Sequence, residues 1–409
     1  MKSRRLLLFA AIFLTASTLG ITLPAQAQSA VLKNEPARYT LTDLGPVGAG
    51  SGPLHLTNNG LISGASSYKG AEQATLWYEG RKFDIGTPGL GGTNSVSFGV
   101  NRWAQAVGEA DTAEKDPNGE DVCGFAASGF TSGATCLPFA WLDGVLTALP
   151  TLAGKNGKRG PNGAANVIND SGEVAGLSET TTVDSTCPAY NPSKGQRQKL
   201  ETKPVAWLFG DVQELPTLGD DPDGAALAIN DQGSIAGTSG TCAPFNPATL
   251  LNIQPVHAIL WENGNAIDLK SLGGNTGNIA LGINDRDDVV GGSDVTGDTT
   301  SHGFLWTRET QTMQDLVPFG EDVFSTAIAI NHHRTVIGVS IDAQGNLRAA
   351  LWQDGEPFDL NSRISASSSL YLLLACSINS HGEIIGLAVD TKTGAAHGYL
   401  ATPVGDPDR

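Results

Sequence analysis

Short apolar runs alternate with polar turns along almost the whole chain, and this pattern repeats. Each repeat has small apolar residues ending at Asn, with Gly seven positions later, as in AALAINDQGSIAG. The pairs are Asn101/Gly108, Asn169/Gly176, Asn230/Gly237, Asn284/Gly291, Asn331/Gly338 and Asn379/Gly386, with a version one residue shorter at Asn58/Gly64. Seven such pairs along the chain indicate seven repeated units of supersecondary structure.

Each unit predicts four strands. The first strand is the run before Asn, the second contains the Gly, and the Asn, Asp and Gly residues between them suit a tight hairpin because they tolerate positive φ. A third run ends at Trp, and a fourth carries an acidic residue, as in HAILW followed by NAIDL. The tryptophans are Trp77, Trp141, Trp207, Trp261, Trp306 and Trp352. Short connections within a unit predict an antiparallel meander.

Seven such meanders predict an all-β fold, a seven-bladed β-propeller in one domain over residues 28–409. The last unit stops at Arg409 without a fourth strand, whereas residues 38–44 form a strand without a unit of its own. We therefore expect residues 38–44 to complete the seventh blade and close the ring. Ala401 stands where the other units have Trp, so six blades plus an irregular terminal unit is the alternative.

Residues 1–27 have the pattern of a secretory signal peptide. Lys2, Arg4 and Arg5 precede an apolar run, and the small-residue sequence AQA at 25–27 suits a cleavage site. An uncleaved anchor helix is the alternative. The sequence predicts a secreted or periplasmic protein that does not insert into the membrane after cleavage.

The amino-acid composition and the net charge restrict both the fold class and the kinds of partner that we expect. The 51 Gly and 21 Pro exclude a mostly helical protein, and 40% hydrophobic residues are enough for a packed core. Without the three basic residues of the leader, 22 basic residues face 42 acidic ones, a net charge of −20. This charge disfavours binding to nucleic acid. We expect a monomer whose partner is an extracellular carbohydrate or protein.

The longest inserts follow the second strands of units two to four, and the strand order places them on one face. They contain Cys123, Cys136, Cys187 and Cys242. In an exported protein these four residues predict two disulfides, Cys123–Cys136 within one insert and Cys187–Cys242 between neighbours, although the sequence leaves the other two pairings open. Cys376 lies in an apolar run and is predicted to be a buried free thiol.

The same inserts carry aromatic residues that could stack on a sugar or peptide. The candidate ligand-binding residues are Phe125, Phe130, Tyr190 and Phe245. The alternative is that they pack their own loops, because large loops need a small core.

Two groups of polar side chains could have a metal-binding or structural role. Asp220, Asp221 and Asp223 offer oxygen ligands for calcium, but an ordinary acidic turn is the alternative and no EF-hand pattern is present. No other cofactor is expected. His257, His302 and His397 occupy the same third-strand position, which predicts a repeated structural hydrogen bond.

The units resemble the HAF repeats of bacterial secreted proteins. HAILW, HGFLW and HGYLA match the repeat motif, and LGG precedes the first strand at 90–92 and 272–274. The resemblance covers about residues 39 to 402 and implies an extracytoplasmic, propeller-like protein. It brings no established catalytic motif.

The function predicted from these features is a binding or scaffold module whose long loops in units two to four recognise a ligand. We expect no enzymatic activity, because the sequence contains no familiar catalytic motif and the inner strands carry hardly a charge apart from His55. The alternative is an enzyme acting on polysaccharide through Glu109, Asp111, Asp220 or Asp221. Carboxylates converging at the channel mouth would favour that alternative.

Overall fold

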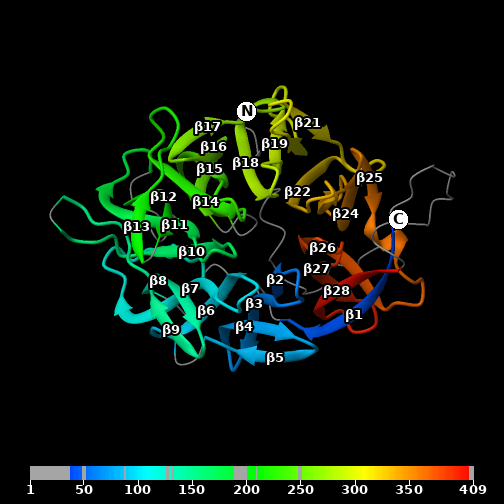
Figure 1. Ribbon diagram of the computed structural model, residues 1–409, viewed down its shortest axis with the longest axis horizontal. Helices are drawn as coiled ribbons and strands as arrows, with labels where there is room; N and C mark the ends of the chain where they lie inside the picture. Colours follow the sequence, from blue (N-terminus) through cyan, green and yellow to red (C-terminus); the bar gives the residue numbers. More distant parts are fainter. Residues whose placement is uncertain are drawn as a thin grey trace.

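Seven four-stranded antiparallel sheets surround a central axis as the blades of a β-propeller (Figure 1). The computed structural model describes residues 37–47, 52–86, 89–125, 129–130, 133–155, 157–187, 200–208, 210–246 and 251–404. The predicted seven-bladed fold is confirmed, and the alternative of six blades is wrong. The leader predicted at residues 1–27 lies outside the described residues. No helix in the described part of the chain is long and apolar enough to cross a membrane.

Each of the first six blades contains four consecutive strands, counted from the central axis outward. Blade 1 contains β2 (Gly52–Leu56), β3 (Ile62–Tyr68), β4 (Ala71–Tyr78) and β5 (Arg81–Asp84). Blade 2 contains β6 (Gly91–Val100), β7 (Ala106–Lys115), β8 (Ala134–Leu142) and β9 (Val145–Ala148). Blade 3 contains β10 (Gly163–Ile168), β11 (Val174–Val183), β12 (Leu200–Leu208) and β13 (Asp211–Glu214).

The other blades follow the same order. Blade 4 contains β14 (Asp223–Ile229), β15 (Ile235–Asn246), β16 (Leu251–Glu262) and β17 (Asn265–Asp268). Blade 5 contains β18 (Gly273–Ile283), β19 (Val289–Val295), β20 (Ser301–Trp306) and β21 (Met313–Leu316). Blade 6 contains β22 (Phe324–Ile330), β23 (Val336–Ile341), β24 (Leu347–Gln353) and β25 (Glu356–Asp359), followed by the 3-10 helix η3 (Leu360–Arg363).

The seventh blade joins the two ends of the described chain. β26 (Leu370–Ile378), β27 (Ile384–Asp390) and β28 (Ala396–Val404) are completed by β1 (Arg38–Pro46), which lies beside β28 in Figure 1. Their antiparallel register runs from Arg38 opposite Val404 to Pro46 opposite His397. The predicted closing strand is confirmed. Closure removes the free edge that β28 would otherwise expose.

Apolar cores lie mainly between neighbouring blades. In one of them, Ala258 and Leu260 of blade 4 pack with Ala280, Phe304 and Trp306 of blade 5. Neighbouring blades must stack because a single sheet cannot bury both of its faces. In blade 7, Ala401 is fully buried beside Tyr39 and Tyr399, so two tyrosines fill the core of the one unit that lacks the repeat Trp.

The repeat Gly is required by a close approach of two strands. Gly176 lies opposite Ala165 on β10, just before the register of that strand shifts at a β-bulge. A Cβ at Gly176 would collide with the backbone carbonyl of Ala164. The corresponding collision occurs at the repeat Gly of each blade, and the partners are the carbonyls of Gly52, Val96, Ala164, Ala225, Ile279, Thr326 and Leu374. The repeat Gly therefore leaves room for the bulge that bends the inner strand.

The repeat asparagines form a chain of hydrogen bonds around the ring. The Asn169 Oδ1 atom accepts backbone N–H bonds from Ser171 and Glu173 and so closes its own turn. Its Nδ2 atom donates to the Asn230 carbonyl of the next blade at 3.1 Å. The same inter-blade bond joins Asn101 to Asn169, Asn230 to Asn284, Asn284 to Asn331, Asn331 to Asn379, and Asn379 to Thr57.

The first unit corrects the predicted repeat. Thr57, rather than Asn58, takes the position of the repeat Asn. Its backbone N–H and its hydroxyl both donate to the Leu61 carbonyl, and these hydrogen bonds close the turn. Thr57 also lies seven residues before Gly64, so the spacing is regular. The link to blade 2 is instead made by the Asn59 side chain, which donates to the Arg102 carbonyl at 3.0 Å.

Deleting residues 28–45 is expected to abolish cooperative unfolding, because β28 loses its edge partner and the ring opens. Thermal unfolding followed by circular dichroism and intrinsic fluorescence measures this, and the two probes should no longer coincide. A single transition at the wild-type temperature would contradict closure by β1.

Asn230→Ala is expected to lower the free energy of unfolding by about 2–4 kcal/mol, because it removes buried hydrogen bonds on both sides of one blade junction. Urea denaturation measures the change. The control is Asn265→Ala, whose exposed side chain makes a 3.4 Å bond only to Asn263. Equal effects of the two substitutions would refute a structural role for the asparagine ring.

Candidate acidic site at the junction of the first three blades

Buried acidic side chains gather where blades 1, 2 and 3 meet, on the face that carries the long inserts. The buried members are Glu72, Glu109, Asp111, Asp116, Glu120 and Glu179, each at most 5% exposed. Burying a carboxylate is costly unless it is paired, hydrogen-bonded or protonated. A set of this kind is therefore a candidate functional site. We call these six residues, together with Asp121, the acidic band.

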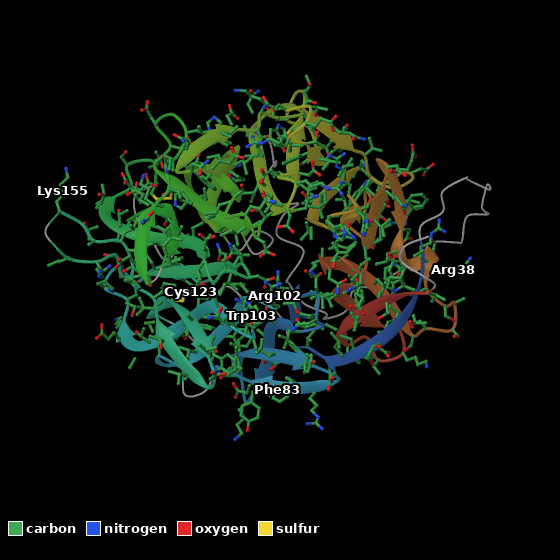
Figure 2. All side chains as sticks on the ribbon, in the orientation of Figure 1. Arg38, Phe83, Arg102, Trp103, Cys123 and Lys155 are labelled. Carbon is green, nitrogen blue, oxygen red and sulfur yellow. A yellow bond between two sulfur atoms is a disulfide. The ribbon has the colours of Figure 1, made fainter. Side chains whose placement is uncertain are left out.

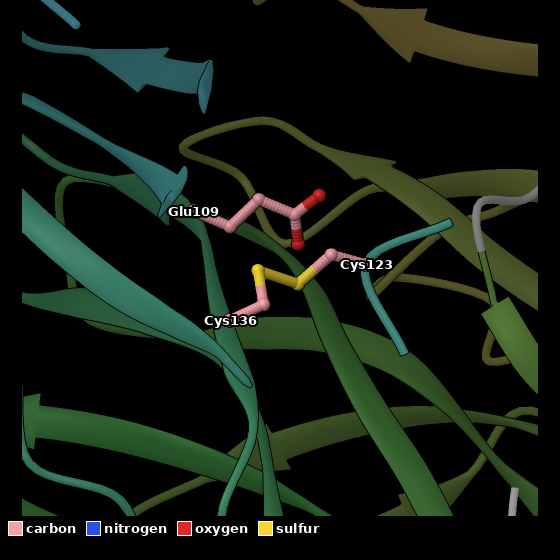
Figure 3. A group of neighbouring side chains, drawn as sticks. All are labelled: Glu109, Cys123 and Cys136. Carbon is pink, nitrogen blue, oxygen red and sulfur yellow. A yellow bond between two sulfur atoms is a disulfide. The ribbon is translucent and has the colours of Figure 1, made fainter. Parts of the chain in front are cut away.

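Glu109 lies at the centre of one half of this band. It lies on β7, opposite Val96 of β6 and Pro138 of β8. Figure 3 shows its side chain beside the Cys123–Cys136 disulfide, with the carboxyl group toward Cys123. Burial, and then the carboxylates of Glu72, Asp111 and Asp121, raise the pKa of Glu109 well above its usual range. Glu109 therefore keeps its proton to a higher pH than an ordinary glutamate does.

Two asparagines join the acidic band across the blade junctions. Asn94 accepts the Glu72 backbone N–H through Oδ1 and donates to Asp111 through Nδ2 at 2.7 Å. Asn162 accepts the Cys136 N–H and donates to both Asp116 and Glu179 at 2.8 Å. The two asparagines stand seven residues before the repeat residues Asn101 and Asn169. The band is thus built on equivalent positions of the repeat.

The segment 116–125 carries acids to both halves of the band. Asp116 Oδ1 accepts the backbone N–H groups of Asn118 and Glu120, which fixes the turn. The charge of Asp121 raises the pKa of Glu109, whereas the charges of Glu120 and Asp116 raise the pKa of Glu179. The segment is attached to β8 by the Cys123–Cys136 disulfide.

Both predicted disulfides are confirmed. Cys123–Cys136 lies within the insert of blade 2, and Cys187–Cys242 joins the inserts of blades 3 and 4. Cys376 is a free thiol, and burial raises its pKa to about 12, so it remains protonated. Part of the fourth insert forms strands, since β15 and β16 extend to Asn246 and from Leu251.

The aromatic platform predicted for the loops is not supported where it can be assessed. Phe125 is 1% exposed and packs on Ala65 and Val96, and Phe130 lies against the same cluster. These two rings therefore form the core of the insert, as in the packing alternative. Tyr190 and the side chain of Phe245 lie outside the described residues.

The three aspartates of the predicted calcium site belong to separate networks. Asp221 accepts bonds from His257 and from Ser239, fully buried Asp223 accepts the Thr202 N–H, and Asp220 is exposed. This calcium candidate is therefore not supported. Among the described residues, the groups of three with ligand atoms within 4.8 Å of one another are Glu109/Cys123/Cys136 and Asp184/Cys187/Cys242. Each contains a disulfide and thus no thiolate.

The third-strand histidines have the predicted structural role. The Nδ1 atoms of His257, His302 and His397 lie 2.8–2.9 Å from carboxylate oxygens of Asp221, Asp315 and Asp43. In blade 6 the same position holds Arg348, whose Nε lies 2.9 Å from Asp322. His55 is separate from the acidic band. Burial lowers the pKa of His55 to about 4, although the charge of Asp170, in a hairpin turn of the opposite face, partly offsets this shift by raising the pKa.

Two surface hollows border the acidic band. One of about 260 Å³ is lined by Gln73, Thr93 and Asn94, among others. The other, of about 820 Å³, lies between blades 2 and 3 and includes Lys115 and Pro117 on either side of Asp116. A volume of this size is in the range of ligand sites. The band therefore lies next to space that a ligand could enter.

The sequence predicted only part of this site. Glu109 and Asp111 were candidates, but Glu72, Asp116, Glu120 and Glu179 were not. One available signal was the repeat itself, because Glu179 follows Gly176 by three residues, as Asp111 follows Gly108. The joining of distant carboxylates by Asn162 had no such signal.

No family model and no curated protein matches the chain. Among solved structures it is similar to an oligogalacturonate lyase from Vibrio parahaemolyticus, with 11% identity and a TM-score of 0.49, covering 88% of this chain and 93% of that one. It is also similar to a gluconolactonase from Xanthomonas campestris, with 11% identity and a TM-score of 0.41, covering 94% and 99%.

A third similar structure is a puromycin-hydrolysing peptidase from Mycobacterium tuberculosis, with 13% identity and a TM-score of 0.48. The match covers 85% of this chain, which spans about half (53%) of the peptidase. The identities are too low to carry an activity to this chain.

The prediction that the protein is not an enzyme is corrected. It rested on the lack of a familiar catalytic motif and of charged residues on the inner strands, but the structure brings Glu72, Glu109 and Asp111 together in a buried set between blades 1 and 2.

Glu109→Gln is expected to stabilise the protein at pH 8 by about 1 kcal/mol or more and to change little at pH 5. The folded-state pKa of Glu109 is raised above its ordinary 4.5, so the folded protein holds a proton that the unfolded chain has released. Stability from this group therefore falls as pH rises from about 4.5 toward the folded pKa. Urea denaturation in chelator at both pH values measures this. The control is Glu356→Gln, which changes an exposed side chain on β25, and a destabilised Glu109→Gln at pH 8 would contradict the assignment.

Proposed function

We propose that the protein is an exported propeller enzyme that cleaves glycosidic bonds in neutral polysaccharides or oligosaccharides, with Glu109 as the general acid. The observation that carries this proposal is the Glu109 carboxyl, which is buried among other carboxylates that, together with burial, raise its pKa well above the ordinary range. A general acid works best when its pKa lies near the working pH.

The neighbours of Glu109 supply the second half of such chemistry. Asp111 accepts a hydrogen bond from Asn94, so its carboxylate is held in place as an acceptor. Glycoside hydrolysis uses two carboxyl groups, one that gives a proton to the leaving oxygen and one that acts as base or nucleophile. Glu109 would take the first role, and Asp111 is the candidate for the second.

Charge supports a neutral substrate. The acidic band would repel a phosphorylated or polyanionic chain, and the net charge of the whole chain is −17. Two disulfides and the leader pattern at residues 1–27 support export, where such a substrate would be met. We therefore favour neutral extracellular glycans.

The purified mature protein is expected to release reducing ends from at least one neutral glycan in a panel that also contains polyanionic glycans. Glu109→Gln should lower kcat at least about 100-fold, since the proton donor is removed. Glu356→Gln, on blade 6, should retain full activity and serves as the matched control. Turnover of polyanionic glycans alone, no turnover at all, or full activity of Glu109→Gln would each refute the proposal.

A further inference from the structure

Tyr68 is an exposed aromatic side chain beside the Glu109 half of the acidic band. It is the last residue of β3 and is 57% exposed. Together with Gln73 of β4 it lines the hollow of about 260 Å³, and Thr93 and Asn94 of β6 line the same hollow from blade 2. The hollow therefore combines one aromatic ring with several polar side chains.

A tight turn fixes the position of Tyr68. Lys69 and Gly70 alone join β3 to β4, and both have positive φ (51° and 82°), as in a type I′ hairpin. Blades 2 and 3 instead have long inserts at this connection, between β7 and β8 and between β11 and β12. Blade 1 therefore places no insert over Tyr68 and holds its ring on a short hairpin.

The blade 2 wall of the hollow leads directly to the candidate catalytic groups. Asn94 accepts the Glu72 backbone N–H through Oδ1 and donates to Asp111 through Nδ2. Gly92 also lines the hollow, and a Cβ at this position would lie 2.2 Å from the Asp111 Cβ. Asp111 therefore lies directly behind the wall at Gly92.

Polar groups surround the Tyr68 ring. The Lys69 ammonium lies over the ring, 4.9 Å from its centre. The Gln73 side chain donates to the Thr93 carbonyl and so connects the two blades that form the hollow. Ligand sites commonly combine aromatic surface with a few fixed polar groups of this kind.

The other exposed aromatic side chains of the described residues lie elsewhere. Trp103, labelled near the central axis in Figure 2, belongs to the β6–β7 turn and donates to the Asp170 carbonyl. Phe83 lies at the outer edge of blade 1 in the same view, and Tyr78 lies at the end of β4 away from Tyr68. Tyr68 is the one of these residues that lines the hollow beside the acidic band.

We propose that Tyr68 stacks on a sugar ring of the substrate and forms a subsite for a neutral glycan beside Glu109 and Asp111. This role rests on the proposed function, in which these two carboxyl groups act on the glycosidic bond. A sugar has C–H groups on its faces and hydroxyls at its edge, so it suits an aromatic ring bordered by an ammonium and amides. Tyr68 would bind the substrate and take no part in proton transfer.

The test is calorimetric titration of the Glu109→Gln protein with cellohexaose, xylohexaose, mannohexaose and maltohexaose. We expect at least one of these neutral hexasaccharides to bind. Tyr68→Ala in the same background should raise the Kd at least about tenfold, because the stacking surface is lost. Tyr68→Phe and Tyr68→Trp should keep the Kd within about threefold, since each retains a flat ring.

The matched control is Tyr78→Ala, because Tyr78 is also an exposed tyrosine of blade 1 but lies at the other end of β4. This variant should bind the hexasaccharide as the parent protein does. In the active enzyme, Tyr68→Ala should raise KM at least about fivefold with little change in kcat, as expected for a residue that contributes binding alone.

The outcomes separate this subsite from the proposed activity. Hexasaccharide binding that depends on Tyr68, without turnover by the wild-type protein, would support the subsite and refute the hydrolase. Turnover with Kd and KM unchanged in Tyr68→Ala would overturn the subsite alone. The subsite would also be overturned if none of the four hexasaccharides bound, or if Tyr68→Ala and Tyr78→Ala weakened binding equally.

Discussion

The hydrogen bond from each repeat asparagine to the carbonyl of the next blade is the interaction on which the ring depends. The same asparagine side chain makes two kinds of contact, since its Oδ1 atom accepts the hydrogen bonds that close the local hairpin and its Nδ2 atom donates to the neighbouring blade. In the six blades that carry this asparagine, the residue that closes the inner turn therefore also fixes the distance to the next blade. This coupling, together with the apolar faces between blades, makes seven weak sheets one cooperative structure.

A rigid ring makes the acidic band physically possible. Carboxylates such as Glu109 and Glu179 lower stability when buried, and they persist only where the surrounding structure fixes them. Here the second strands of blades 2 and 3, the amides of Asn94 and Asn162 and one disulfide hold them. The opposite face carries the asparagine ring, so the supporting contacts and the candidate chemistry lie at opposite ends of the same strands.

The architecture was largely predictable because each blade has the same sequence pattern. Asn and Gly at a fixed spacing, Trp at the end of the third strand and an unpaired strand at residues 38–44 led directly to seven closed blades. The prediction failed at Thr57, because a hydroxyl can close the same turn as an amide and a search for Asn overlooks it. The sequence left two roles open for Phe125, stacking on a ligand or packing its own loop, because local pattern does not distinguish them, and the structure places this ring in the core of the insert.

The sequence by itself determined the strands, their order, the closure of the ring and the face that bears the inserts, because each follows from local pattern and chain connectivity. Only the tertiary structure decided which acids share one environment. The charges of Glu72, Asp111 and Asp121 raise the pKa of Glu109. Asp116 and Glu179 are 63 residues apart in the sequence but accept hydrogen bonds from the same amide group, that of Asn162. Burial and distance between carboxylates set their protonation, and both arise only when neighbouring blades pack.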